Sequence, residues 1–343
     1  MDLQTFCNKI PKIELHCHLK GTVRAKTFVE LAKKHRIPLP PYDQPEDLYY
    51  EFKDFYDFLK MYGLISESLR DRTDFQRIAY EAQEDAAKCG IRYRELSFSP
   101  MVHLDLGVSF YEALGGIVDG IHDAEKDFGI QGRVIVSINR METPEKAVEL
   151  VEIALQDKPE DLIGIGMGYA EAGNPPEKHW KAFRIAQSAG LHLTAHACED
   201  GPPRNVETCL DLLCCERIDH GYQVVEDEEI TIRCRDDGVI FTVCPTTSSK
   251  WPGRIDFASH PIRDMVEQGL KIMINSDDPP MYGTDLGLEY LIMAEKLGVE
   301  VAKFEELVMN SIEGSWLDES TKRQWQYDWS CEIRDLMVEL DEQ

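Results

Sequence analysis

Histidine and carboxylate side chains stand at the ends of short apolar segments that lie far apart in this chain. The residues at these positions are His16, His18, His196, Asp277 and Asp278. Zinc in a catalytic site takes a small set of nitrogen and oxygen ligands and keeps one position open for water. These residue types therefore predict a metal centre, provided that folding brings the segment ends together.

The elements that must position these residues alternate regularly along the chain. Apolar segments of strand length are separated by longer amphipathic segments with helical period. The predicted strands span residues 12–18, 93–100, 132–138, 162–168, 191–197, 217–221, 240–245 and 271–278. This alternation predicts an α/β protein, a (β/α)8 TIM barrel formed by residues 1–343 as a single domain, whose strands end at one common face. An open doubly wound sheet is the rival, but no glycine-rich dinucleotide-binding turn follows the first strand.

Two regions do not fit the plain repeat. Residues 40–64 form part of a long insertion after the first strand and are rich in aromatic and acidic residues. They predict a helical lid over the catalytic face, or an ordinary amphipathic helix whose apolar stripe packs on the barrel. Residues 315–343 predict C-terminal helices that pack on the outside.

Charge and cysteine usage narrow the class of protein. With 37 basic and 63 acidic residues, the net charge is −26, which disfavours nucleic acid and membrane surfaces as partners. Ten cysteines, several inside apolar patterns, indicate reduced thiols rather than a disulfide framework. No signal-peptide pattern and no apolar stretch of bilayer length is present, so we expect a cytoplasmic protein. The oligomeric state stays open, with a homo-oligomer as one alternative.

The spacing inside the motifs suggests which side chains meet. Residues two apart in a strand share a face, so His16 and His18 both point to the barrel mouth. The segment HLTAHACE ends a strand at His196 and places Glu199 three residues later, and RIDHG places His220 where the sixth strand runs into a loop. Each motif alone is weak evidence, but their joint placement at strand ends favours one catalytic centre.

Together these motifs resemble the adenosine and adenine deaminase family of the amidohydrolase superfamily, a group of metal-dependent hydrolases, over about residues 8–315. The matching segments are PKIELHCHLKG, YRELSFSP, HACE, RIDHG and NSDDPP. Further segments look most like the bacterial adenine deaminase and 6-aminodeoxyfutalosine deaminase branches: GNPPEKH, EDGPP and DDPPMYGTDL. The fourth predicted strand, LIGIGMG, has no lysine that could bridge two metals, which favours the subtype with one metal.

The resemblance implies a zinc-dependent hydrolytic deaminase that replaces the 6-amino group of adenine, adenosine or a close derivative by oxygen and releases ammonia. One Zn²⁺ per chain would be held by His16, His18, His196 and Asp277, and would lower the pKa of the attacking water. Glu199 would act as general acid on the purine ring, and His220 would orient and deprotonate the water with help from Asp277. Asp278 would hold the five-membered ring.

Alternatives remain at this point. The substrate could be an N6-substituted adenine or 6-aminodeoxyfutalosine, and the reaction could be another hydrolysis of the superfamily, of an amide or a phosphoester. A purine-binding protein without catalysis is a third reading from a different class.

Three departures from the family pattern bear on the substrate. Lys20 stands where these enzymes usually carry an acid, so it either meets an acceptor-rich or anionic substituent or turns outward to the acidic insertion. Tyr169 replaces a glycine whose amide meets the purine, and its side chain could narrow the pocket or stack on the ring. Cys198 replaces the glycine of HAGE. Glu171 is retained and is expected to support the substrate loop.

Overall fold

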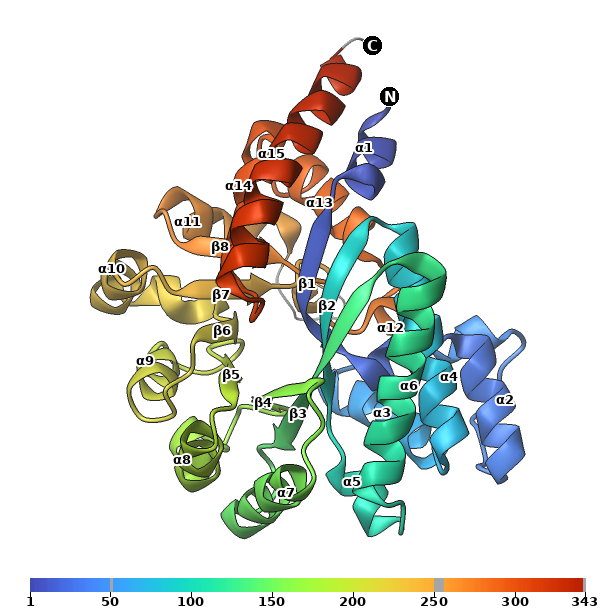
Figure 1. Cartoon of the computed structure of the whole chain (residues 1–343). Coiled ribbons are helices and arrows are strands. Elements are labelled where there is room, and N and C mark those ends of the chain that lie inside the picture. Colours follow the sequence, from blue (N-terminus) through green and yellow to red (C-terminus); the bar gives the residue numbers. More distant parts are fainter. Residues whose placement is uncertain (50–51, 250–255, 342–343) are drawn as a thin grey trace.

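The computed structural model arranges eight strands in one sheet in chain order, and every neighbouring pair is parallel (Figure 1). The structure describes residues 1–49, 52–249 and 256–341. The strands are β1 Lys12–His18, β2 Ile91–Phe98, β3 Gln131–Asn139, β4 Leu162–Gly168, β5 His192–Ala197, β6 Arg217–His220, β7 Ile240–Val243 and β8 Lys271–Ile274. The predicted (β/α)8 barrel is confirmed.

Helices surround the strands as an outer layer (Figure 1). The α-helices are α1 Leu3–Lys9, α2 Ala25–His35, α3 Phe55–Glu67, α4 Arg72–Lys88, α5 Met101–Asp105, α6 Phe110–Phe128, α7 Pro144–Gln156, α8 Trp180–Ser188, α9 Arg204–Asp211, α10 Glu228–Asp236, α11 Ile262–Glu267, α12 Pro279–Tyr282, α13 Leu286–Glu295, α14 Phe304–Gly314 and α15 Glu319–Asp341. Short 3-10 turns are η1 Leu19–Thr22, η2 Pro45–Leu48, η3 Pro176–His179, η4 Tyr222–Glu226, η5 Thr247–Ser249, η6 Phe257–Ser259 and η7 Val301–Lys303. No helix in the described ranges is both long and apolar enough to cross a membrane.

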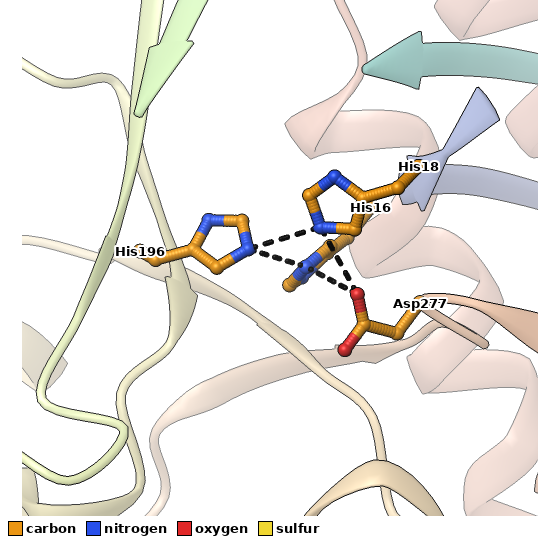
Figure 2. A group of neighbouring side chains, drawn as sticks. All are labelled: His16, His18, His196 and Asp277. Carbon is orange, nitrogen blue, oxygen red and sulfur yellow. Dashed lines mark hydrogen bonds and ion pairs between the residues drawn. The ribbon is translucent and has the colours of Figure 1, made fainter. Parts of the chain in front are cut away.

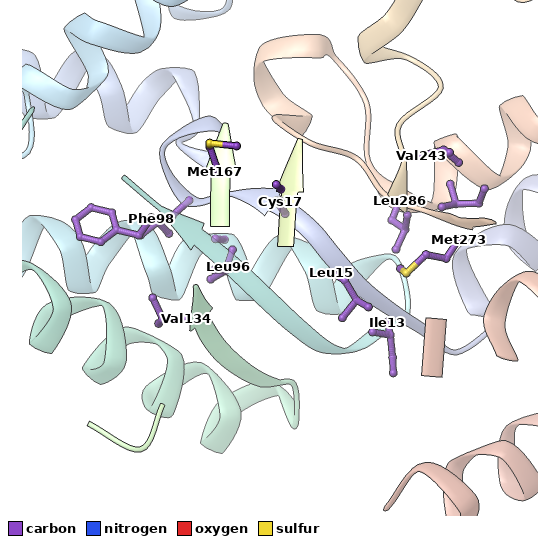
Figure 3. Close-up of a cluster of buried hydrophobic side chains, with 14 of the residues drawn as sticks. Ile13, Leu15, Cys17, Leu96, Phe98, Val134, Met167, Val243, Met273 and Leu286 are labelled. Carbon is purple, nitrogen blue, oxygen red and sulfur yellow. The ribbon is translucent and has the colours of Figure 1, made fainter. Parts of the chain in front are cut away.

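Apolar side chains on the strands are buried between the barrel and the helices. Figure 3 shows part of this cluster, to which β1, β2 and β8 all contribute. The side chains labelled there are Ile13, Leu15, Cys17, Leu96, Phe98, Val134, Met167, Val243, Met273 and Leu286. Removing such surface from water stabilises the fold by roughly 25 cal/mol per Å². The packed core therefore fixes the strands whose ends carry the polar residues.

The first strand contains a β-bulge that reorients its polar side chains. The pairing with β2 shifts register between Glu14 and Cys17, and the amides of Leu15 and His16 both donate to Oδ1 of Asn275, at 2.9 and 3.0 Å. Glu14 consequently faces the outer layer, where it pairs with Arg94, whereas the next alternate residue, His16, faces the barrel interior. A bulge re-aims side chains in this way.

The barrel closes at the seam between β1 and β8 through a few specific contacts. One isolated bridge joins Cys17 to Asp277, and the amide of His18 donates to the carbonyl of Asp277 at 2.9 Å. The amide of Ser276 donates to Oε1 of Glu14 at 2.9 Å. We had expected strand geometry to continue through residue 278, but this is wrong: β8 ends at Ile274 and Asp277 has a φ of 63°.

The insertion and the tail are helical. Within residues 40–64 the structure has η2 and most of α3, which extends to Glu67, while residues 50 and 51 lie outside the described part. Beyond residue 315 the described chain forms one long helix, α15, in place of several.

Candidate metal centre and active site

The four predicted ligands converge on one point at the mouth of the barrel (Figure 2). The Nε2 atoms of His16 and His18 each lie 3.1 Å from Nε2 of His196. Oδ1 of Asp277 lies 3.4 Å from Nε2 of His16 and 3.0 Å from Nε2 of His18. Ligand atoms about 2.0–2.2 Å from a tetrahedral zinc ion are separated by roughly 3.3 Å. Three imidazoles and one carboxylate at these spacings fit a single divalent cation.

Neighbouring groups fix the ring nitrogens so that the lone pairs face this point. The hydroxyl of Thr242 donates to Asp219 at 2.9 Å and therefore accepts from Nδ1 of His16, at 3.0 Å. Nδ1 of His196 faces Oδ2 of Asp219 at 3.2 Å, an ion-pair distance that lacks hydrogen-bond geometry. In His16 the proton is therefore on Nδ1, and Nε2 is the atom with the free lone pair, which is how metal-binding histidines are commonly oriented. In His196 the carboxylate of Asp219 beside Nδ1 favours the same arrangement.

His220 is oriented by the same kind of network. The hydroxyl of Tyr222 donates to the carbonyl of Cys244 at 3.0 Å and accepts from the amide of that residue at 2.9 Å. Nδ1 of His220, 3.3 Å from this hydroxyl, therefore donates to it. Nε2 is left as an acceptor, 3.7 Å from Oε2 of Glu199. Burial holds the pKa of His220 well below its ordinary value, which favours the neutral ring.

The loop that carries Glu199 is held by the carboxylate of Glu171. Oε1 accepts from the amide of Cys198 at 2.8 Å and from Nδ2 of Asn205 at 2.6 Å, while Oε2 accepts from the amides of Glu199 and Gly201 at 3.0 and 3.1 Å. A Cβ at Gly201 would lie 2.5 Å from this carboxyl group, so the position requires glycine. Glu171 therefore supports the loop, and it is not among the residues that line the cavity.

The two adjacent carboxyls of the last loop differ in their surroundings. Burial opposes the charge of Asp277, but His16 and His18 outweigh it and hold the pKa of this carboxyl well below its usual range. Burial and the charge of Asp277 raise the pKa of Asp278 well above its usual range. Oδ1 of Asp278 has no hydrogen-bond partner among the described residues. A Cβ at Gly21 would fall 1.7 Å from this oxygen, so the carboxyl packs directly on that glycine.

A cavity opens above these groups and joins polar to aromatic side chains. Its polar members are His18, His196, Glu199, His220, Thr247, Asp277 and Asp278, and its apolar and aromatic members are Phe55, Phe58, Leu59, Tyr62, Tyr169 and Tyr282. Residues of α3 thus border the site, as a lid would, and Phe58 stacks on Tyr282 with ring centroids 5.2 Å apart. Such a slot accepts a flat, partly polar ring.

Lys20 lies beside the cavity and does not line it. Its side chain is fully buried, so it does not turn outward to the acidic insertion. Nζ donates to the carbonyl of Ser99 at 3.2 Å and lies 4.8 Å from the centre of the Tyr62 ring. Burial lowers the pKa of Lys20 to about 7, against the opposing influence of Asp278.

Comparison with known proteins identifies the family. A family model described as adenosine deaminase matches residues 11–327. An adenine deaminase from Caulobacter vibrioides is 35% identical over 323 residues, which cover 93% of each chain. The chain belongs to the adenosine deaminase family. Among solved structures, an amidohydrolase from Burkholderia ambifaria with bound zinc is 36% identical with a TM-score of 0.93 and covers 99% of this chain and 95% of that one. An adenine deaminase from Arthrobacter aurescens is 31% identical with a TM-score of 0.90 and covers 95% of this chain and 99% of that one.

Two of the positions where this member of the adenosine deaminase family departs from its relatives have a left-handed backbone. The φ angles are 72° at Tyr169 and 60° at Cys198, and site residues His220 and Asp277 have φ angles of 66° and 63°. Glycine adopts this region freely, whereas other residues pay about 1–2 kcal/mol. Tyr169 and Cys198 therefore hold this backbone conformation at a conformational cost.

Sequence reasoning missed the residues that orient the ligands. Asp219 receives hydrogen bonds from the hydroxyls of Thr194 and Thr242 at 3.0 and 2.9 Å and faces His196. The acidic residue directly before His220 in RIDHG, inside a predicted strand, was a signal in the sequence that could have indicated this carboxylate. Nothing near Asn275 in the sequence indicated its contact with β1.

Proposed function

We propose that this chain is a zinc-dependent hydrolytic deaminase of adenine or a close 6-aminopurine, built as a single domain. The observation that carries the proposal is the convergence of three imidazole Nε2 atoms and one carboxylate oxygen beside an acid and a neutral imidazole. Adenine deaminases that match almost the whole chain support the choice of substrate, and the zinc-bound amidohydrolase supports the choice of metal.

A divalent metal bound by His16, His18, His196 and Asp277 would supply Lewis-acid activation of a water. Nε2 of His220 is positioned to accept a proton from this water molecule while the water oxygen adds to the carbon that bears the amino group. Glu199 donates a proton to the adjacent ring nitrogen, so that the ring accommodates the electron pair. The proton held by His220 passes to the amino group, the carbon–nitrogen bond breaks and ammonia leaves. The proton of the new hydroxyl group returns to Glu199, which leaves an oxo group on that carbon.

Binding of the ring falls to the remaining members of the cavity. Asp278 lines the cavity with an oxygen that has no hydrogen-bond partner in the described part of the chain, and it can exchange a hydrogen bond with the five-membered ring. The aromatic side chains of α3, with Tyr282, provide flat apolar surfaces that exclude water. In this proposal α3 acts as a lid and Glu171 keeps the acid in place, while Lys20 acts indirectly through Tyr62.

The test is an absorbance screen with adenine, adenosine, N6-methyladenine and 6-aminodeoxyfutalosine. The second readout is the released amine, which is methylamine from N6-methyladenine and ammonia from the other three, and metal content is measured per chain. We expect loss of the 6-amino chromophore with at least one of these and about one zinc per chain. A folded, metal-loaded protein that releases neither ammonia nor methylamine from any of them overturns the proposed function. Glu199→Gln is the matched control, because it should retain the metal and lose about 10²–10⁴ in rate.

A further inference from the structure

A second cavity lies directly behind one wall of the active site. Leu59, Tyr62 and Tyr169 line both cavities, so these three side chains form the partition between them. The active-site cavity has a volume of about 50 Å³ and the second cavity one of about 220 Å³. More space therefore exists on the far side of the partition than on the side of the active site.

The partition is a braced aromatic pair. The rings of Tyr62 and Tyr169 meet edge to face at 88°, with centroids 6.1 Å apart. Lys20 lies under Tyr62 and is tied to the carbonyl of Ser99. Burial raises the pKa of Tyr169 to about 12, and a hydrogen bond with the Ser99 side chain opposes this shift. Lys20 thus contacts the Tyr62 ring, and Ser99 is linked both to Lys20 and to Tyr169.

Tyr169 has a backbone conformation that disfavours residues with a side chain. Its φ of 72° is a conformation that glycine adopts freely and L-residues rarely adopt. Replacement by glycine would therefore relieve the backbone and remove half of the partition at the same time. The position is consequently suited to a clean test of what the ring does.

The second cavity has the lining expected around a hydroxylated group. Hydroxyl and amide side chains of Ser66, Ser99, Ser137 and Asn139 face it. Its two carboxylates, Asp105 and Glu142, are both paired with Lys146. Such a surface can exchange hydrogen bonds with a sugar and offers no free cation for a phosphate.

In the proposed binding mode, the five-membered ring of a purine would lie on the side of this partition. Asp278, which would hold that ring, lines the same cavity as Tyr62 and Tyr169 and packs on Gly21. The preceding residue, Lys20, lies against the Tyr62 ring at 4.8 Å. A sugar on the five-membered ring would therefore run into the aromatic pair before it reached the hydroxyl-lined space.

We propose that the Tyr62–Tyr169 partition determines substrate size: it restricts the enzyme to the free 6-aminopurine base and closes off a cavity that would otherwise hold the sugar of a nucleoside. This inference rests on the proposed deaminase function. Tyr169 is its central specificity-determining residue, and Lys20 is a positioning residue that acts through Tyr62.

The experiment compares kcat/KM for adenine and adenosine in the wild type, Tyr169→Gly and the matched control Tyr169→Phe, which keeps the ring and loses the hydroxyl. The wild type should prefer adenine. Tyr169→Gly should raise the ratio of adenosine to adenine at least about tenfold, mainly through a lower KM for adenosine, and Tyr169→Phe should leave it within about twofold. Tyr62→Leu, which removes the other ring, is the second variant if Tyr169→Gly does not fold.

Two results overturn the proposal: a wild type that prefers adenosine, or a folded variant lacking either ring whose substrate ratio does not change. If the wild type deaminates neither compound, the proposed function fails, and calorimetric binding then tests the partition separately. Tighter adenosine binding by Tyr169→Gly than by wild type and Tyr169→Phe supports the partition, and equal binding by all three contradicts it.

Discussion

The two sides of the active site are held in place by different means. On one side, the seam between β1 and β8 positions His16, His18 and Asp277 through backbone bonds, the Asn275 side chain and the link from Glu14 to Ser276. On the other side, the main anchor of the loop that carries Glu199 is one carboxylate, that of Glu171, which receives four hydrogen bonds. Gln223 adds a bond from its amide to the carbonyl of Cys198 at 2.9 Å and a longer one from its side chain to the carbonyl of Glu199 at 3.5 Å.

This difference suggests a division of labour between binding the metal and delivering the proton. A metal site needs several ligands that are each placed to within a few tenths of an ångström. Because several independent contacts hold the seam, the loss of one contact should leave the ligands close to their positions. The acid needs one correctly placed carboxyl, and one charged anchor is sufficient. Removal of one contact at the seam should therefore weaken metal binding only in part, whereas removal of the Glu171 carboxylate should displace the loop that carries Glu199.

Glu171→Gln should have the largest effect. Glutamine keeps one oxygen acceptor but places an NH2 donor against one of the two donor pairs, either Cys198 with Asn205 or Glu199 with Gly201. The loop therefore loses half of its side-chain anchor, and Glu199 loses its fixed position. We expect kcat to fall by about 10²–10⁴, the range of general acid catalysis, with metal content unchanged. Steady-state kinetics together with metal analysis checks this. Asn205→Ala, which removes only one of the four donors, is the control and should cost far less; a Glu171→Gln enzyme with near-normal kcat would contradict the division.

Glu289→Gln should change how stability depends on pH. This buried carboxyl accepts from the amide of Thr246 and the hydroxyl of Thr284, and so joins the loops after β7 and β8. Burial raises the pKa of Glu289 from 4.5 to about 7. Because the folded state holds the proton more tightly than the unfolded chain, the contribution of this group to the free energy of unfolding is full below about pH 4.5 and is lost as the pH rises through about 7.

Glutamine stays neutral throughout, so the free energy of unfolding of Glu289→Gln relative to wild type should increase by about 3 kcal/mol between pH 4.5 and 8. Urea unfolding at both pH values measures this difference. A constant difference across that range would show that the carboxyl of Glu289, which joins the loops after β7 and β8, does not titrate there.

The barrel and its ligands could be read from the sequence because both depend on local patterns. Apolar strand segments and the histidines at their ends are visible within a few residues, and parallel strands force those ends to one face. The bulge at Leu15 and His16 could not be foreseen, because its acceptor, Asn275, lies 259 residues beyond His16. For the same reason the strand pattern placed Asp277 within β8, although it lies beyond the end of that strand, in an isolated bridge to Cys17 and with a left-handed backbone.

The environment of Lys20 was hidden for a related reason. Its charge suggested either a substrate contact or an exposed position, whereas its partners, Ser99 and Tyr62, come from separate segments that only the fold brings together. Residue type and local spacing therefore predicted which polar side chains the fold brings together, but did not predict which side chains position them.

Asn275→Ala tests the tolerance of the seam. The variant leaves the amides of Leu15 and His16 without their acceptor, while the backbone bonds to Asp277 remain. We expect zinc affinity to fall by about 10–100-fold, as for other groups that orient ligands, and kcat of the fully metal-loaded enzyme to change little. Competition with a chelator measures the affinity. A complete loss of metal binding would show that the seam has no redundancy and that both sides of the site depend on single residues.

Cys198→Gly should have the smallest effect and should act in the opposite direction. Cys198 has a φ of 60°, and its thiol is buried with a raised pKa. Replacement by glycine removes the conformational cost of the left-handed backbone, about 1–2 kcal/mol. Part of this gain in stability is offset, because the unfolded chain becomes more flexible and the burial of the thiol is lost. The free energy of unfolding should therefore rise by no more than about 1 kcal/mol, measured by urea denaturation. Because the anchor at Glu171 is untouched, kcat should stay within about twofold of wild type; a large loss of kcat would mean that the thiol itself, and not only the carboxylate, holds the acid loop.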